Sequence, residues 1–312
     1  GEIDTLGGEN IMTFVHEFIL LGFPCSREIQ VILFMFFCIV YLLTLMGNGA
    51  IICAVCWDQK LHTPMYFLLG NFAFLEIWYV NSTMLINFLS DKKTISFVGC
   101  FLQFYFFFSL GTSECLHLAV MVFDWYLTIC HPFHYPNLMT GHLCTKLVMI
   151  CWACGFLWFL IPIVLISQMS LCGSNIIDHV VCDLRPLFAL VCVSAPATQL
   201  LCYTLSSLFI IGNSLFIFGS YTLVLTAVLW MPSATGRHKA SSTYGSHLAV
   251  VPLFYGSLMV MYKVATLFYA MVTPLFNPFI YSFRNKEIKA ALRKILGLHI
   301  KQKNVLIWML FK

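Results

Sequence analysis

The sequence predicts an all-α membrane protein: a seven-transmembrane helix bundle followed by a short amphipathic eighth helix. The chain is 60% hydrophobic and 10% charged, with a mean hydropathy of +0.88, whereas a soluble domain is about 25% charged. Seven windows are each long enough to cross a bilayer, which takes roughly 20 apolar residues. Basic residues gather on one side of these windows, as the positive-inside rule expects. Lipid is therefore the solvent for most of the chain.

The predicted spans lie near residues 29–56, 65–89, 97–129, 144–167, 198–231, 241–262 and 264–283. Seven is odd, so the termini are expected on opposite faces. With the amino terminus outside, twelve of the 17 Lys and Arg residues face the cytoplasm, and five lie outside: Arg27, Lys92, Lys93, Arg185 and Lys263. We therefore expect an extracellular segment 1–28, a bundle 29–283 in the plasma membrane, and a cytoplasmic helix and tail 284–312.

The first span is too long for a cleaved secretory signal and is expected to act as an uncleaved insertion signal. The net charge of +4 indicates topology and attraction to anionic inner-leaflet lipid, and nothing suggests a nucleic-acid partner. After the last span, residues 285–296 alternate basic and apolar faces at helical spacing. This pattern predicts a short helix on the inner membrane surface.

Two prolines interrupt the last predicted span, Pro274 and Pro278, with Asn277 between them. Each proline lacks an N–H and pushes its ring against the carbonyl one turn back, a cost tolerated in a membrane helix where neighbouring groups satisfy the backbone. Asn277 is the expected partner for that backbone. The pattern predicts a helix that bends, and the alternative is a fixed kink with no moving role.

Two carboxylates, Glu76 and Glu114, fall inside predicted spans. An acid within the membrane is costly and almost always faces the bundle interior, so each one needs a partner or a proton. Neither a transport nor a catalytic arrangement is needed to explain them, and no enzyme activity is predicted.

The cysteines divide by compartment. Cys100, Cys172, Cys182 and Cys192 are expected outside the membrane, face an oxidising compartment and could pair in three ways. Nine others lie in or beside spans, where a thiol serves as a small apolar filler; two of these have CxxC spacing, for which packing is preferred to a redox or zinc role. The nine are Cys38, Cys53, Cys56, Cys115, Cys130, Cys144, Cys151, Cys154 and Cys202.

Several short segments carry a family resemblance. They are Gly47-Asn48 in the first span, LHTPMYF at 61–67, Phe123-Asp124-Trp125-Tyr126 with Ile129-Cys130 closing the third span, Ser220-Tyr221 in the fifth, Lys239-Ala240 with Ser246-His247 opening the sixth, and residues 274–284 in the seventh. In combination they resemble the motif set of vertebrate olfactory receptors, a branch of the rhodopsin-like G-protein-coupled receptors, over residues 17–296. The resemblance implies an odorant receptor that binds a small, neutral, hydrophobic volatile and activates a stimulatory G protein through cyclic AMP. No cofactor is expected, and no residues are assigned as ligands of a catalytic or structural metal.

The resemblance also implies a disulfide pattern. Receptors of this family join the cysteine at the top of the third helix to the middle cysteine of the second outer loop, here Cys100 and Cys182. A second bridge within that loop would then join Cys172 to Cys192. Together the two bridges would hold the loop over the mouth of the pocket.

The ligand site that the resemblance implies lies in the outer half of the bundle. Small-molecule sites are mostly apolar with a few placed polar groups, and the implied set has that mix without a carboxylate. The alternative for any one of these residues is packing alone. The set is Phe107, Phe108, Gly111, Thr112, Leu205, Ser206, Phe209, Tyr255, Leu258, Met259, Tyr262, Leu267 and Ala270.

Two further sets come from the resemblance. Intramembrane polar residues lie near the place where related receptors hold a sodium ion, and the alternative is a hydrogen-bonded, protonated pair of glutamates; this set is Asn48, Glu76, Glu114 and Asn277. A second set is assigned to G-protein coupling and the activation switch: Asp124, Trp125, Tyr126, Tyr221, Asn277, Pro278 and Tyr281.

Two departures from the family pattern bear on signalling. Family members usually have MAYDRYVAIC at the inner end of the third helix, but residues 121–130 read MVFDWYLTIC, with Trp125 in place of arginine. Tryptophan is uncharged and has one N–H donor, so Asp124 loses its adjacent ionic partner. The connection at 263–265 is also shorter than usual. The rival interpretation is a receptor-shaped, signalling-defective product; a transporter or channel would predict paired halves with broken helices, which the sequence lacks.

Overall fold

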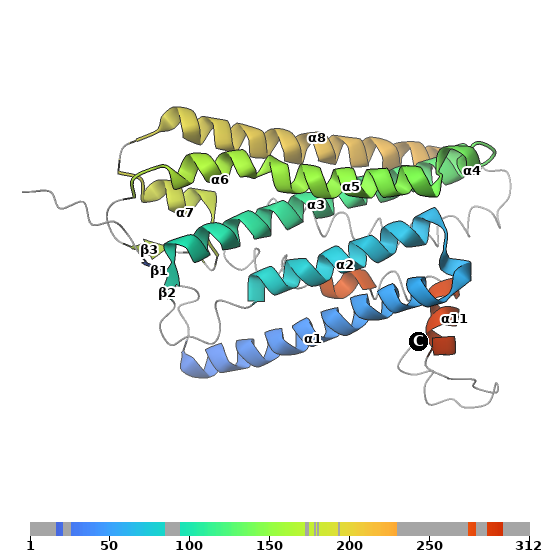
Figure 1. The fold of residues 1–312 in the computed structure, drawn as a ribbon, viewed down its shortest axis with the longest axis horizontal. Coiled ribbons are helices and arrows are strands. Elements are labelled where there is room, and N and C mark those ends of the chain that lie inside the picture. Colours follow the sequence, from blue (N-terminus) through green and yellow to red (C-terminus); the bar gives the residue numbers. More distant parts are fainter. Residues whose placement is uncertain are drawn as a thin grey trace, which may run out of the picture.

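The structure, a computed structural model of the chain, describes residues 17–20, 26–84, 94–171, 175–177, 179, 181–192, 194–229, 274–278 and 286–295. Within these ranges, long helices lie side by side with roughly parallel axes (Figure 1). They are α1 (Arg27–Trp57), α2 (Pro64–Met84), α3 (Phe97–Cys130), α5 (Gly141–Trp158), α6 (Leu160–Ser167) and α8 (Pro196–Leu229).

Four stretches among the described residues are long and apolar enough to cross a membrane: Arg27–Trp57, Phe97–Cys130, Gly141–Ser167 and Pro196–Val228. They correspond to the predicted first, third, fourth and fifth spans. The second predicted span is found as α2, which packs between α1 and α3. The sixth and seventh predicted spans lie outside the described residues, apart from 274–278, which are helical.

The fourth predicted span is two helices rather than one. α5 ends at Trp158, Phe159 forms a turn, and α6 begins at Leu160. Pro162 explains the break, because it has no N–H to donate to the carbonyl of Trp158 four residues earlier, and its ring crowds that carbonyl.

α3 lies at the centre of the described bundle, where it packs against α2, α5 and α8. Its contact with α5 is close at Gly155, where a Cβ would overlap the Ser113 hydroxyl and lie 2.9 Å from the Ser109 carbonyl. Small residues allow membrane helices to approach in this way. α1 lies at the edge instead, with outward side chains such as Ile32 and Met46 67% and 70% exposed. Lipid covers such a face in a membrane.

One end of the bundle carries a three-stranded sheet that the sequence analysis did not predict. β1 (Glu17–Leu20) lies between β2 (Thr94–Ser96), which is antiparallel to it, and β3 (Ile176–Ile177), which is parallel to it. These strands and α7 (Leu184–Ala189) gather at the left end of Figure 1. Phe18, Phe104 and Leu187 belong to the apolar cluster beneath them. We call this the outer end.

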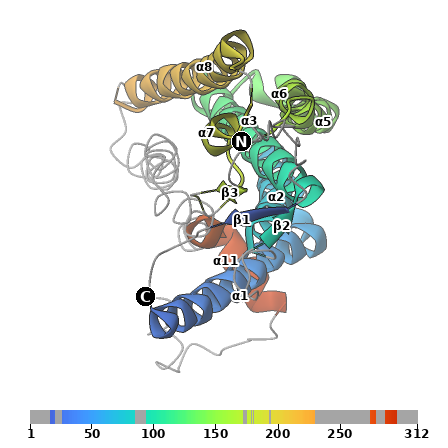
Figure 2. The same cartoon turned by 90° about the vertical axis from the view of Figure 1, so that its left-hand side faces the viewer.

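The opposite, inner end holds η1 (Gln59–Leu61), α4 (Tyr135–Leu138) and α11 (Lys286–Ile295). In Figures 1 and 2, α11 lies beside α1 and crosses the direction of the bundle helices. Ile288 and Ala291 are buried, whereas Arg293 and Lys294 are exposed. The predicted amphipathic helix at 285–296 is therefore confirmed as α11.

Candidate functional site

A disulfide fastens the outer loop to α3. Cys100, in the first turn of α3, is bonded to Cys182 with a Cα–Cα distance of 5.6 Å, and both residues are fully buried. The Gln103 side-chain oxygen accepts a hydrogen bond from the Cys182 backbone N–H at 3.4 Å. The bridge that the family resemblance implies is therefore present. We call residues 181–192 the lid.

The second implied disulfide is only partly within the described residues. Cys192 is disulfide-bonded, and its backbone N–H donates to the Ser170 carbonyl at 2.9 Å. Leu171 and Val191 form an antiparallel bridge, so the residues that precede Cys172 and Cys192 in sequence lie against each other. Cys172 itself lies outside the described residues, and its pairing with Cys192 stays a prediction.

The lid contains a buried acid at the start of α7. The Asp183 carboxylate accepts a hydrogen bond from the Leu184 backbone N–H at 2.6 Å. Nearby, the buried His179 ring accepts a hydrogen bond from the Val181 backbone N–H at 3.3 Å. Burial raises the pKa of Asp183, and the Leu184 N–H and His179 oppose this only in part. The folded lid therefore favours the protonated form of this carboxyl more than water does.

Below the lid, aromatic rings pack together in the region where ligand residues were predicted. Phe107 is 6% exposed, and its ring lies 5.3 Å from that of Tyr79 on α2. Phe108 is half-buried and stacks on Phe159, in the turn between α5 and α6, at 5.2 Å. The centre of the Phe104 ring lies 4.8 Å from that of Phe108 and 6.3 Å from that of Phe159. We call these five rings the aromatic wall; they join α2, α3 and the fourth span.

The other predicted ligand residues have different settings. On α3, Gly111 is half-buried and Thr112 is buried. On α8, the Ser206 hydroxyl donates to a carbonyl one turn earlier at 3.0 Å, and Phe209 contacts the Trp158 ring at 5.6 Å. The remaining six lie outside the described residues: Tyr255, Leu258, Met259, Tyr262, Leu267 and Ala270.

Leu205, also predicted as a ligand residue, lines an apolar groove between α5, α6 and α8. The groove has a volume of about 220 Å³ and is lined by Leu205, Cys154, Leu157, Trp158 and Ile161. Leu157 and Ile161 are 62% and 55% exposed, so the groove opens on the outside of the bundle. Leu205 therefore meets a space that faces lipid in a membrane.

Halfway along the bundle, α2, α3 and segment 274–278 bring polar side chains together. The Asn277 side-chain N–H donates to the Glu76 carboxylate, and Glu114 lies within hydrogen-bonding reach of Glu76. All three residues are almost fully buried. We call them the polar centre. Because two adjacent carboxylates repel each other in a low dielectric, the polar centre requires a shared proton or a bound cation.

Asn48 on α1 satisfies the backbone of the proline-containing segment. Pro278 has no N–H, so the Pro274 carbonyl four residues earlier lacks its helical partner. The Asn48 side-chain N–H donates to that carbonyl at 3.3 Å. Gly47 permits the approach, since a Cβ there would lie 2.8 Å from the Pro278 ring. The prediction that Asn277 would satisfy this backbone was wrong, because its amide donates within the polar centre instead.

At the inner end of α3, Asp124 has a partner that the sequence analysis missed. Its buried carboxylate accepts a hydrogen bond from the Tyr135 hydroxyl of α4 at 2.9 Å. Burial and the neighbouring Asp124 both raise the pKa of Tyr135, so the hydroxyl keeps its proton and donates. Trp125 is 5% exposed. The Asp124 carboxylate is thus bonded to a tyrosine hydroxyl, while the next residue, Trp125, stands where family members usually have arginine.

The remaining residues assigned to coupling are spread along the inner half. The Tyr126 hydroxyl lies 3.2 Å from a ring nitrogen of His131, just beyond the end of α3. Tyr221 is buried in α8 and belongs to the main apolar cluster. Pro278 contacts α1 as described above, and Tyr281 lies outside the described residues.

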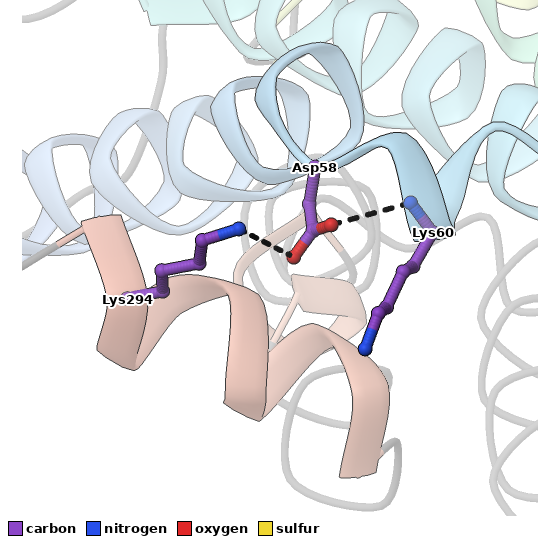
Figure 3. A network of polar contacts seen from close by, with 3 residues as sticks. All are labelled: Asp58, Lys60 and Lys294. Atoms are coloured by element: carbon purple, nitrogen blue, oxygen red, sulfur yellow. Dashed lines mark hydrogen bonds and ion pairs between the residues drawn. The ribbon is translucent and has the colours of Figure 1, made fainter.

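Two polar contacts link α11 to the inner ends of α1 and α2. The Tyr66 hydroxyl donates to the Glu287 carboxylate at 2.6 Å. The Lys294 ammonium lies 4.0 Å from one oxygen of Asp58, whose other oxygen accepts the Lys60 backbone N–H at 3.2 Å. Figure 3 shows Asp58 between these two groups. Tyr66 is part of the LHTPMYF string, so one physical role of that motif is to anchor α11.

The described helices have the arrangement of a rhodopsin-like helix bundle. The chain is similar to squid rhodopsin, with a TM-score of 0.64 at 17% identity, over 92% of this chain and 93% of the rhodopsin chain. At this level of identity the likeness concerns the fold alone.

Sequence comparison supplies the family. The family model described as olfactory receptor matches residues 37–299. The chain is 71% identical to human olfactory receptor 11H12 and 70% identical to human olfactory receptor 11H2, in each case over 91% of this chain and 92% of the relative. The protein belongs to the olfactory receptor family of G-protein-coupled receptors, which are multi-pass plasma-membrane receptors and not enzymes.

Proposed function

We propose that the protein binds a small, neutral, hydrophobic volatile in the outer half of the bundle and then activates a stimulatory G protein that raises cyclic AMP. Family membership supports an odorant and a G protein as partners. The composition of the aromatic wall supports the proposed class of ligand. The aromatic wall consists of four phenylalanine rings and the Tyr79 ring, is largely buried and contains no carboxylate, so it favours an uncharged ligand over an amine.

The polar centre is the proposed connection between the ligand and the inner end. Glu114 follows Phe107 by seven residues on α3, which corresponds to roughly 10 Å along a helix. The polar centre joins α2 and α3 to the proline-containing segment, the part of the last span most suited to bending. A ligand that favours one arrangement of these groups shifts the receptor between two states. We propose that the centre holds either a shared proton or a sodium ion.

The proposed orientation places the amino terminus outside and α11 in the cytoplasm. The excess of Lys and Arg on the inner side supports it. The disulfide at the other end also supports it, because disulfides persist in an oxidising compartment.

The test of ligand binding is a cyclic-AMP assay with a panel of neutral and charged odorants in cells that display the receptor. Phe108→Ala should weaken the response to an activating odorant by roughly tenfold, because a lost aromatic contact is worth about 0.5–1.5 kcal/mol beyond its buried area. Phe106→Ala is the matched control, since Phe106 lies on the same helix and is 42% exposed. Equal losses of response and surface display in both variants would favour packing over binding.

A second candidate function is odorant binding without signalling. The observation that favours it is the buried, uncharged Trp125 beside an Asp124 that is already bonded to Tyr135. Tryptophan cannot present the charged, bidentate donor that arginine offers. Trp125→Arg should therefore raise cyclic-AMP output at matched surface level. Equal, robust output from both forms would contradict this account, and silence from both would shift attention to the short connection at 263–265.

A further inference from the structure

The described free thiols differ in exposure and in depth along the bundle. Cys53, Cys56 and Cys154 are exposed. Cys56 is the last residue but one of α1, and Cys53 lies one turn earlier, so both are near the inner end. Cys154 lies thirteen residues into α5, which corresponds to roughly 20 Å from the inner end of that helix. Cys144 is near the inner end but is buried. Only Cys53 and Cys56 combine exposure with an inner position among the described free thiols.

Both thiols face away from the bundle. The buried stripe of α1 near its inner end consists of Asn48, Ile51 and Ala54. Cys53 and Cys56 each follow a buried residue by two positions, which is about 200° around a helix. Their sulfur atoms therefore lie on the side of α1 that meets lipid.

Neighbouring groups mark the level of the inner membrane surface. Trp57, next to Cys56, is 72% exposed, and tryptophan concentrates where membrane and water meet. The amphipathic helix α11 lies against α1 at the same level, with Lys294 4.0 Å from Asp58 (Figure 3). An amphipathic helix of this kind lies in the interfacial plane. Cys56 is therefore at the inner membrane boundary, and Cys53 lies one helical turn deeper in the membrane.

We propose that Cys53 and Cys56 form a site of S-acylation, with Cys56 as the principal acceptor of a long-chain acyl group. Juxtamembrane cysteines are the usual targets of this modification, and residues 284–312 contain no cysteine that could compete. The inference goes beyond odorant detection, and it rests on the orientation proposed above.

The reaction is a thioester exchange with a membrane acyltransferase that carries the acyl group on its own thiol. The sulfur of Cys56 attacks the acyl carbonyl carbon, a new carbon–sulfur bond forms, and the old one breaks. The departing thiol takes up the proton from Cys56, so no oxidant or reductant is needed. The acyl chain then lies along the exposed face of α1, where Leu42 and Met46 are 56% and 70% exposed.

The test is metabolic labelling of the full-length receptor with an alkyne analogue of palmitate, followed by hydroxylamine, which cleaves thioesters. Label is expected on the natural sequence, with most of it lost in Cys56→Ala and all of it lost in Cys53→Ala/Cys56→Ala. Cys144→Ala and Cys154→Ala are the matched controls and should keep their label. Surface display is measured for every variant, so that a folding defect is recognised.

Hydroxylamine-sensitive label that persists in Cys53→Ala/Cys56→Ala would overturn the proposal. So would the absence of label on a natural sequence that reaches the surface. An epitope at the carboxyl terminus, stained with and without permeabilisation, tests the orientation independently. Staining without permeabilisation would refute the orientation, whereas absent label with a cytoplasmic epitope would refute acylation alone.

Discussion

At the outer end of the bundle, a disulfide, a three-stranded sheet and an apolar cluster hold the lid to α3. At the inner end, α11 packs apolar residues such as Ile288 and Ala291 against the bundle, and single polar contacts add to this packing: Tyr135 to Asp124, Tyr66 to Glu287, and Lys294 to Asp58. The disulfide, sheet and apolar cluster of the outer end support one another and are lost together. Each polar contact of the inner end can be broken separately, at a small cost in free energy.

The difference between the ends fits a receptor that must keep a binding site intact while it changes shape elsewhere. Regions that rearrange are drawn from the less stable parts of a protein. The lid is held covalently as well as by apolar packing, whereas α4 and α11 are held by apolar packing and polar contacts without a covalent bond among the described residues. The predictions below remove one contact at a time, starting with the contact expected to matter most.

The largest effect is expected from Cys100→Ser/Cys182→Ser. Removing a native disulfide typically costs about 2–5 kcal/mol, and this bridge closes a separation of 82 residues. We expect little receptor at the cell surface and a lower thermal midpoint in detergent. Cys154→Ser is the control, because it removes an exposed thiol that is not bridged. Normal display of the double variant would show that the sheet and apolar cluster hold the lid unaided.

The next effect is expected at the inner end, from Tyr135→Phe. The change leaves the buried Asp124 without its hydroxyl donor, a loss worth about 1–3 kcal/mol. Cys144 is buried close enough for Asp124 to act on it electrostatically, so its reaction with a small thiol reagent reports on local opening. We expect that reaction to become roughly fivefold faster or more.

The control for this experiment is Tyr126→Phe, which removes a hydroxyl that contacts His131 rather than Asp124. Cys144 should react at the natural rate in that variant. An unchanged rate in Tyr135→Phe would mean that the hydrogen bond to Asp124 does not hold α4 in place, and the inner end would then be as firmly fixed as the outer end.

A smaller effect is expected in the lid, from Asp183→Ala. Losing a side chain that caps a helix start costs about 1 kcal/mol, whereas Asp183→Asn keeps an acceptor for the Leu184 N–H.

The stability of the lid should also depend on pH through Asp183. Because burial raises the pKa of Asp183, the contribution of its protonated form to stability is full below the ordinary value near 3.8 and falls as the pH rises through the raised pKa. The asparagine variant should lack this dependence. Thermal midpoints between pH 3 and pH 7 measure the difference, and parallel curves would contradict it.

The smallest effect is expected from Lys294→Ala. The Lys294 side chain is 72% exposed and 4.0 Å from Asp58, and exposed ion pairs contribute about 0–1 kcal/mol. The thermal midpoint should hardly change, and any change should shrink as salt is added. Tyr66→Phe should lower the midpoint more, because the Tyr66 hydroxyl is 2.6 Å from Glu287 and part-buried. The reverse order would mean that the ion pair is the main anchor of α11.

Much of the architecture could be predicted from the sequence because lipid imposes strong rules. Long apolar windows gave α1, α3 and α8, and the alternation of basic and apolar residues gave α11. The break at Phe159 could also have been predicted, since Pro162 lies inside the predicted fourth span at 144–167. The outer sheet was not, because strands such as Ile176–Ile177 are too short to show a period and depend on partners far away in sequence.

The candidate site was predictable in part for a similar reason. Buried polar residues such as Glu76 and Asn277 are conspicuous in an apolar chain, and the structure pairs them. Their partners are harder to assign, because a hydrogen bond depends on which helices lie side by side. Tyr135 lies in α4, a helix of 4 residues that is too short to show a periodic pattern, so nothing in its local sequence marked it as the partner of Asp124.

The hydrogen bond from Asn48 to the Pro274 carbonyl has a consequence for biosynthesis. The two residues are 226 positions apart, and ribosomes produce the chain from its amino terminus. The carbonyl that Pro278 leaves without a helical donor has no partner from its own helix when it enters the bilayer, where an unpaired polar group costs several kcal/mol. Its partner belongs to the first helix made, which has by then been in the membrane longest. The proline-containing segment therefore obtains this hydrogen bond only when it reaches the first helix of the bundle.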